Sequence, residues 1–72
     1  MQIVAVQLGE VTVQLSEKEL VLVNNALNEV CNGIDVPEFA TRLGAGISEV
    51  RELLKEVNIL LDHHLLRQER LP

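Results

Sequence analysis

Aromatic residues are almost missing from this chain, which has one Phe and no Trp or Tyr among its 72 residues. The core must therefore be aliphatic, and with apolar residues at 47% of the sequence there is material to build one. Because unpaired bases stack on aromatic rings, the shortage argues against binding of single-stranded nucleic acid. The length predicts one domain with a small core.

Cysteine and basic residues are also scarce. Cys31 is the single cysteine, which excludes an internal disulfide and fits a reducing, cytoplasmic compartment. Six Lys and Arg residues stand against eleven Asp and Glu residues, so the formal net charge is −5. This balance has the wrong sign for a protein that gains affinity by neutralising phosphates. The N-terminal stretch has no positive region and Gln7 interrupts its apolar run, so we expect neither a secretory signal nor a membrane span.

Residues 3–15 predict a β-hairpin. Two β-rich runs flank Gly9-Glu10, which has the Gly-X form of a two-residue type II′ turn. Pairing Leu8 with Val11 in this register gathers the apolar residues on one face. The members of that predicted face are Val4, Val6, Leu8, Val11, Val13 and Leu15. An isolated two-stranded ribbon is marginal in water, so the face needs a cover.

A helical part follows over residues 16–72. Ser16 and Glu19 have the spacing of a capping box, and the helix that they start is predicted to end at Asn32-Gly33. Its apolar residues recur with helical spacing and predict a buried stripe. The stripe consists of Leu20, Val23, Leu27, Val30 and Cys31.

Two more helices are expected. Asp35 and Glu38 repeat the capping pattern before a short helix that ends near Leu43. A third helix begins near Ile47 or Ser48 and can continue without Gly or Pro to Arg70.

The connection between these two helices carries the most specific pattern in the chain. Ala40 and Gly44 are four residues apart, so that Ala40 would allow close approach of two helices and Gly44 would supply a positive φ at the turn. Apolar residues stand at the matching positions Phe39, Leu43, Ala45, Val50 and Leu53. The segment resembles a helix-turn-helix. The predicted fold is α+β: a β-hairpin followed by three helices, the last two forming a helix-turn-helix-like corner and the last one long.

The third helix is more apolar than a three-helix corner requires. Surplus apolar side chains on a small monomer mark a partner surface, so we predict a homodimer. The candidate interface residues are Ile59, Leu60, Leu65 and Leu66. A second candidate surface is polar, because three Asn residues within five positions are a poor choice for a merely solvated helix. Its candidate recognition residues are Asn24, Asn25, Asn28 and Glu29, with Arg42 as a cationic neighbour.

Two functions remain open from the sequence. The favoured one is a small cytoplasmic, non-catalytic module for dimerisation and protein–protein interaction. The alternative is a DNA-binding transcriptional regulator, since the helix-turn-helix resemblance implies a helix in the major groove. Its DNA-contacting residues would be Arg42, Ser48, Arg51 and Lys55. Acidic residues on the same helix argue against this alternative.

No catalytic or metal centre and no cofactor are expected. His63 and His64 are adjacent, so on a helix they point about 100° apart and do not reach one ion. Cys31 belongs to an apolar stripe, which favours core packing over reactivity. Residues 24–44 also resemble segments of small uncharacterised bacterial proteins, in which a helix ending in Asn-Gly leads into a short helix ending in Arg-Leu-Gly. That resemblance implies no activity.

Overall fold

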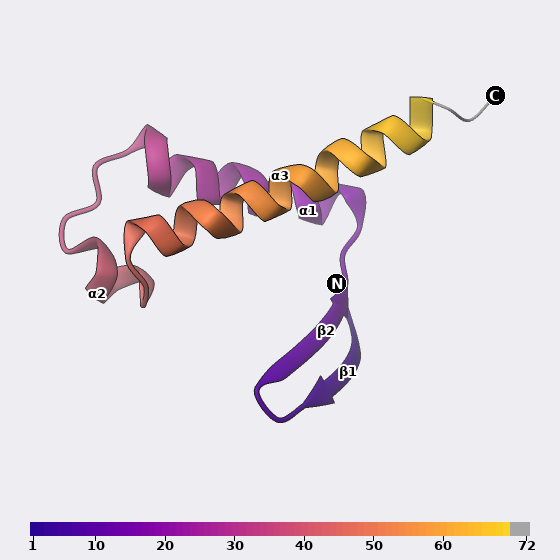
Figure 1. Ribbon diagram of the computed structural model, residues 1–72, viewed down its shortest axis with the longest axis horizontal. Coiled ribbons are helices and arrows are strands. Elements are labelled where there is room, and N and C mark those ends of the chain that lie inside the picture. Colours follow the sequence, from indigo (N-terminus) through magenta and orange to yellow (C-terminus); the bar gives the residue numbers. More distant parts are fainter. Residues whose placement is uncertain (70–72) are drawn as a thin grey trace.

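The computed structural model describes the backbone of residues 1–69 and the side chains of residues 1–63. An antiparallel hairpin is followed by three α-helices, the last of them long, as the sequence predicts (Figure 1). The elements are β1 (Gln2–Gln7), β2 (Glu10–Gln14), α1 (Glu17–Asn28), the π-helical segment η1 (Glu29–Gly33), α2 (Phe39–Leu43) and α3 (Ile47–Glu69).

The hairpin forms, but its predicted register is wrong. Gln7 pairs with Glu10 and Val6 with Val11, so the two turn residues are Leu8 and Gly9. Gly9 has a φ of 83° and Leu8 has no positive φ, whereas a type II′ turn needs the positive φ at the first turn residue. Gly9 is therefore the second turn residue, the one with the positive φ, whereas the sequence pattern made it the first.

Because of a β-bulge, the hairpin still has one apolar and one polar face in the observed register. The register changes between Ile3 and Ala5, which leaves Val4 as the extra residue. Ile3 therefore lies opposite Val13 and shares a face with it. We call this surface the hairpin face; it consists of Ile3, Val6, Val11 and Val13. Ile3 enters the predicted set, and Val4, Leu8 and Leu15 leave it, the last because β2 ends at Gln14.

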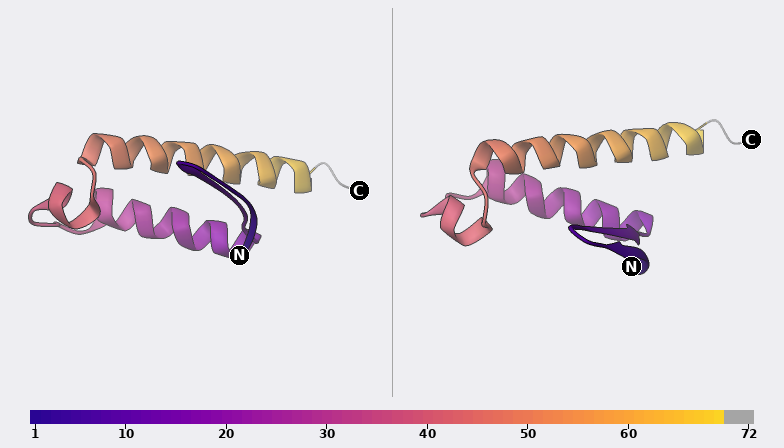
Figure 2. Two further views of the ribbon diagram at one scale, coloured as in Figure 1. Left: turned by 90° about the horizontal axis from the view of Figure 1, so that it is seen from below. Right: turned by 60° about the horizontal axis from the view of Figure 1, so that its bottom comes forward.

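The hairpin stands away from the helices as an arm (Figures 1 and 2). Every residue of both strands is exposed. The arm is held at its base by the start of α1, where the predicted capping box is confirmed: the Glu19 amide donates to the Ser16 hydroxyl (3.1 Å) and the Ser16 amide donates to the Glu19 carboxylate (3.0 Å).

Helix α1 continues through η1 and stops at Gly33, as predicted. The Glu29 side chain lies where a Cβ at residue 33 would be placed, so glycine makes room for it. The second predicted capping box is wrong. Glu38 has a left-handed backbone (φ 54°, ψ 46°) and itself precedes α2, so it cannot serve as the third residue of a helix that starts after Asp35.

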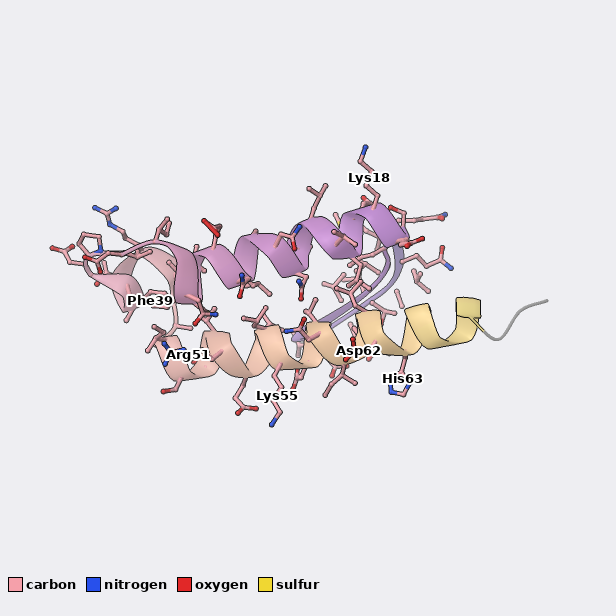
Figure 3. All side chains as sticks on the ribbon, turned by 90° about the horizontal axis from the view of Figure 1, so that it is seen from above. Lys18, Phe39, Arg51, Lys55, Asp62 and His63 are labelled. Atoms are coloured by element: carbon pink, nitrogen blue, oxygen red, sulfur yellow. The ribbon has the colours of Figure 1, made fainter. Side chains whose placement is uncertain are left out.

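The corner between α2 and α3 is only partly as predicted. Gly44 ends α2 with a φ of 78°, and its amide donates to the Ala40 carbonyl (2.8 Å). Ala40 is exposed, however, so its small side chain is not used to bring two helices together. Phe39 and Ala45 are half-buried instead, and both pack against the core (Phe39 in Figure 3).

The core lies between α1 and α3, which run antiparallel beside each other (Figure 2). Cys31, Val50, Leu54 and Val57 are its buried residues, each 6–7% exposed. They confirm the core position of Cys31, and on α3 they recur with the spacing of one helix face. On α1 the stripe turns out shifted, because Val23 is exposed and Asn24 is half-buried.

The surface is large for the mass of the chain. An 8.0 kDa monomer is expected to expose about 4,500 Å², and this chain exposes 6015 Å². The radius of gyration, 14.4 Å, likewise exceeds the roughly 11 Å expected of a compact domain of this length. A projecting arm and a layer of only two long helices expose more surface than a compact domain of the same mass does.

Candidate functional site

The hairpin face is an apolar surface that the fold leaves open. Val6 is 69% exposed and Val11 is 60% exposed, although both are aliphatic residues paired across the ribbon. The opposite face of the ribbon carries polar residues and Ala5. A monomer would keep the hairpin face in water, which is unfavourable for a contiguous apolar patch.

The candidate interface on α3 is partly described. Ile59 and Leu60 are about half exposed, at 47% and 56%, in agreement with the sequence prediction that they lie outside the core. The side chains of Leu65 and Leu66 lie outside the described residues. Leu61 is half-buried and lies on the same face of α3 as the core residues Leu54 and Val57.

The candidate polar residues do not form one site. Asn32 donates through its amide to Asn28 within the same helical segment (3.0 Å), and Asn24 donates weakly to Asn25 (3.4 Å). Arg42 lies on α2 and contacts none of these amides through a hydrogen bond. Asn24 is the exception of interest, because its Oδ1 atom is buried and has no hydrogen-bond partner among the described residues.

Replacing that amide should stabilise the fold. Asn24→Leu removes a buried acceptor without a donor and adds apolar surface to the line of Leu20 and Leu27 on α1. We expect the free energy of unfolding to rise by about 1–3 kcal/mol. Urea denaturation followed by circular dichroism measures it, with Asn58→Leu at an exposed position of α3 as the control, expected to change it by less than about 0.5 kcal/mol. Equal effects of the two variants would contradict a buried Asn24 Oδ1 atom without a donor.

The residues proposed for DNA contact are all exposed. Arg42 lies on α2, while Ser48, Arg51 and Lys55 lie on the first half of α3. Lys55 points away from α1 (Figure 3). The same part of α3 carries a second set of charges, of opposite sign: Glu49, Glu52 and Glu56. DNA binding stays a prediction, which a gel-shift on random duplex at low salt would test.

Those three glutamates border a groove that the sequence analysis missed. The groove has a volume of about 500 Å³ and lies where α1, the α2–α3 turn and the first half of α3 meet. Its lining residues are Leu27, Leu43, Ala45, Glu49, Val50, Glu52, Leu53 and Glu56. We call this surface the acidic-rimmed groove. The spacing of the glutamates, three and then four residues, places them on one helix face and was the available signal.

The glutamates of this rim are not held in ion pairs by the described side chains. Among the described side chains, none of the three carboxylates has a basic partner within salt-bridge distance. Like charges at these spacings destabilise an isolated helix by about 0.2–0.5 kcal/mol per pair. The rim therefore carries an electrostatic cost in the free protein.

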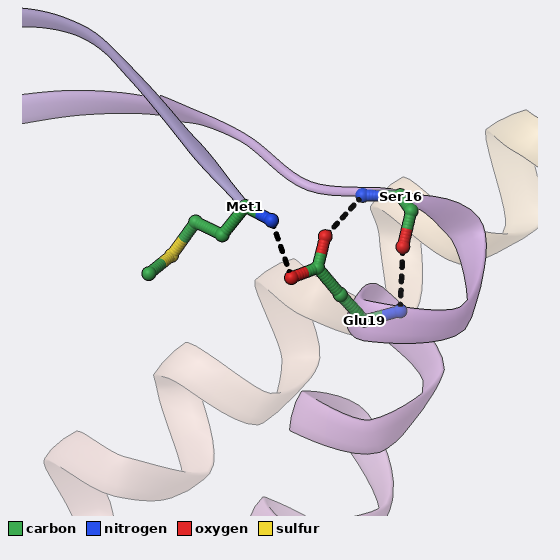
Figure 4. Close-up of polar contacts among 3 residues, drawn as sticks. All are labelled: Met1, Ser16 and Glu19. Carbon is green, nitrogen blue, oxygen red and sulfur yellow. Dashed lines mark hydrogen bonds and ion pairs between the residues drawn. The ribbon is translucent and has the colours of Figure 1, made fainter.

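The base of the hairpin arm is fixed by a small polar cluster (Figure 4). The Met1 ammonium group donates to the Glu19 carboxylate at 2.6 Å, and the other carboxylate oxygen accepts from the Ser16 amide. The hydrogen bond from the ammonium group, followed by those from Ser16, lowers the pKa of Glu19 to about 2. The cluster joins the first residue of the arm to the first turn of α1.

This shifted pKa predicts a pH dependence of stability. A carboxylate whose pKa is lower in the folded state stabilises the fold above its unfolded-state pKa of about 4.5, and the contribution disappears as the pH falls toward 2. We expect the melting temperature of the native chain to fall more steeply between pH 4.5 and 2 than that of Glu19→Gln. Thermal denaturation across this range measures the difference, and Glu10→Gln at the hairpin turn is the control. Parallel curves for all three proteins would contradict the role of Glu19.

Cys31 and His63 are not brought together. Cys31 is 6% exposed in the core, whereas His63 is exposed and points away from α1 (Figure 3). Within the described part of the chain, no three His, Cys, Asp or Glu residues are grouped so that they could hold a metal ion. The side chain of His64 lies outside the described residues.

Two open surfaces thus stand at opposite ends of the helical layer, with the hairpin arm at the start of α1 and the acidic-rimmed groove at the α2–α3 turn (Figure 1). Among the described residues, no helix is both long enough and apolar enough to cross a membrane. Comparison of the chain with protein-family models, with curated proteins and with solved structures finds no match.

Proposed function

We propose that this protein is a small, non-catalytic cytoplasmic module that forms a homodimer, with the hairpin faces of the two copies buried in the interface. The observation that carries the proposal is the exposure of four aliphatic residues on one side of the arm. Ile59 and Leu60 on α3 supply further apolar surface for the partner copy.

The size of the surface supports an assembly of this kind. Each chain exposes about 1,500 Å² more than a compact monomer of its mass. Burial of that excess on two copies would remove about 3,000 Å² from water, which lies in the range of obligate homodimers. A standard transient interface buries only about half as much.

A second copy suits the hairpin face better than a charged partner does. The face has no charged member, and residues 1–15 contain no Lys or Arg and a single acidic residue, Glu10. Two such faces related by a two-fold axis are complementary by construction, because each presents the same aliphatic surface to the other. Closed two-fold symmetry also limits the assembly to a dimer and covers both arms at once.

Light scattering after size exclusion, over a concentration series, tests the proposal. A species of twice 8.0 kDa that persists on dilution to low micromolar concentration is the expected result. A monomer at all concentrations would overturn it. A species that grows steadily with concentration would also overturn it, because open-ended association is not a two-fold dimer.

A further inference from the structure

We propose that the acidic-rimmed groove binds a short amphipathic segment of another protein, one that presents aliphatic side chains on one side and Lys or Arg residues beside them. The segment would lay its apolar side chains on the floor and direct its cations to the rim. This site is separate from the hairpin face and does not depend on homodimerisation.

The floor of the groove is apolar and accessible. Leu43 and Leu53 both line the groove, and their side chains are 38% and 48% exposed. Val50, which is only 7% exposed and belongs to the core, also lines the groove. An apolar side chain of a partner that fits into this groove would remove both its own surface and the surface of these leucines from water, which favours binding.

The rim determines the charge of the occupant. Glu49, Glu52 and Glu56 follow one edge of the floor, and none has a basic partner among the described side chains. Arg51 lies about 130° around the axis of α3 from the centre of the three glutamates, and Lys55, although it stands three residues after Glu52, forms no ion pair with it. A cation from outside would therefore relieve the repulsion along the rim as well as form new ion pairs.

The same charges disfavour the other available occupants. Nucleic acid is repelled by a rim of three carboxylates. The hairpin arm of a second copy carries no Lys or Arg in residues 1–15, and its Met1 ammonium group is already paired with Glu19. The groove also lies at the other end of the helical layer from the arm of its own chain (Figure 1).

The test uses a defined probe, a fluorescein-labelled 12-residue helical peptide of Leu and Lys, with fluorescence anisotropy as the readout. We expect saturable binding to the full chain that weakens as salt rises, and at least 10-fold weaker binding of a matched peptide of Leu and Glu. Equal binding of the two peptides would overturn the proposal, because the rim would then play no part.

Two variants assign the binding to the groove. The triple variant Glu49→Gln, Glu52→Gln, Glu56→Gln and the floor variant Leu53→Ser should each weaken the Leu and Lys peptide by about 10-fold or more. All four positions are exposed, so the variants are expected to fold, which circular dichroism checks. Unchanged affinity in either variant would overturn the proposal.

A charge-matched control separates the groove from the general acidity of the chain. Glu10→Gln, Asp35→Asn and Glu38→Gln together change the net charge by the same amount at exposed positions outside the groove. We expect this control to bind the peptide within 2-fold of the native chain, and an equal loss would overturn the proposal. The oligomeric state is measured on the same samples. A groove variant that alters it would identify a second copy as the occupant and also overturn the proposal.

Discussion

Leu54→Ala is expected to unfold this protein under conditions in which Leu53→Ala leaves it folded. The two residues are neighbours on α3, of the same type, and differ in burial: Leu54 is 7% exposed and Leu53 is 48% exposed. Truncation of a buried leucine removes its transfer free energy and leaves a cavity, at a cost of about 2–5 kcal/mol. Truncation of the half-exposed neighbour removes less apolar burial and leaves no enclosed cavity, so we expect a loss of roughly 1 kcal/mol.

The effect is large because the core is small. Only Cys31, Val50, Leu54 and Val57 are buried among the described side chains. A single core in a domain of this size supplies about 3–5 kcal/mol of net stability, which one cavity can cancel. Leu54 also packs in the cluster that joins the end of α1 to the start of α3, so its loss loosens both helices.

Urea denaturation followed by circular dichroism at 222 nm measures this difference. The native chain and Leu53→Ala should show cooperative transitions, while Leu54→Ala should have lost most helical signal without urea. The experiment is done at several protein concentrations, because a dimer gains stability by mass action. Equal transitions for the two variants would contradict the burial difference between these residues.

The sequence was sufficient for those parts of the fold that depend on local signals. Ser16 and Glu19 form their capping box because each satisfies an amide of the same helix end, whatever the rest of the chain does. Gly44 ends α2 for a similar local reason, since only glycine adopts a positive φ without strain. The order of hairpin and helices followed from such signals.

Features that depend on competition between alternatives were not predictable in the same way. Gly9 can occupy either turn position, and the choice sets the pairing of every residue in the hairpin. The bulge at Val4 then decides that Ile3, and not Val4, joins the hairpin face. For Glu38, the turn after Pro37 imposes a left-handed backbone that removes it from the predicted capping box.

The two candidate surfaces of α3 also differ in how far the sequence predicts them. The exposure of Ile59 and Leu60 could be inferred because α3 has more apolar residues than one stripe holds. The acidic-rimmed groove could not, because it needs Leu27 from α1 beside Leu53 from α3, and only the tertiary packing brings these helices together. The periodicity of its three glutamates was visible, yet a charged helix face is most often just a solvated one.

Val11→Glu is expected to dissociate the proposed homodimer, whereas Thr12→Glu should leave it intact. The two residues are adjacent on β2 and therefore point to opposite faces of the ribbon. Val11 belongs to the hairpin face and is 60% exposed in the single chain, so a glutamate there is solvated in the monomer. In the dimer the same carboxylate would be enclosed by aliphatic side chains with no partner.

Two-fold symmetry enlarges this effect. Each substitution occurs on both sides of the interface, so two carboxylates are desolvated and, where they lie near the axis, also repel each other. We expect the dissociation constant to rise by about 100-fold or more, which corresponds to roughly 3 kcal/mol. Thr12→Glu adds the same charge to the same strand, and the dissociation constant should change by less than about 5-fold.

Sedimentation equilibrium of the native chain and both variants, at equal salt, measures these constants. Circular dichroism at the same concentrations separates a folded monomer from an unfolded one, and either state of Val11→Glu agrees with loss of the interface. A dimer that survives Val11→Glu would rule out burial of the hairpin face, even if the native chain is dimeric. The exposed apolar residues Ile59 and Leu60 on α3 would then be the next surface to test as the place where two copies meet.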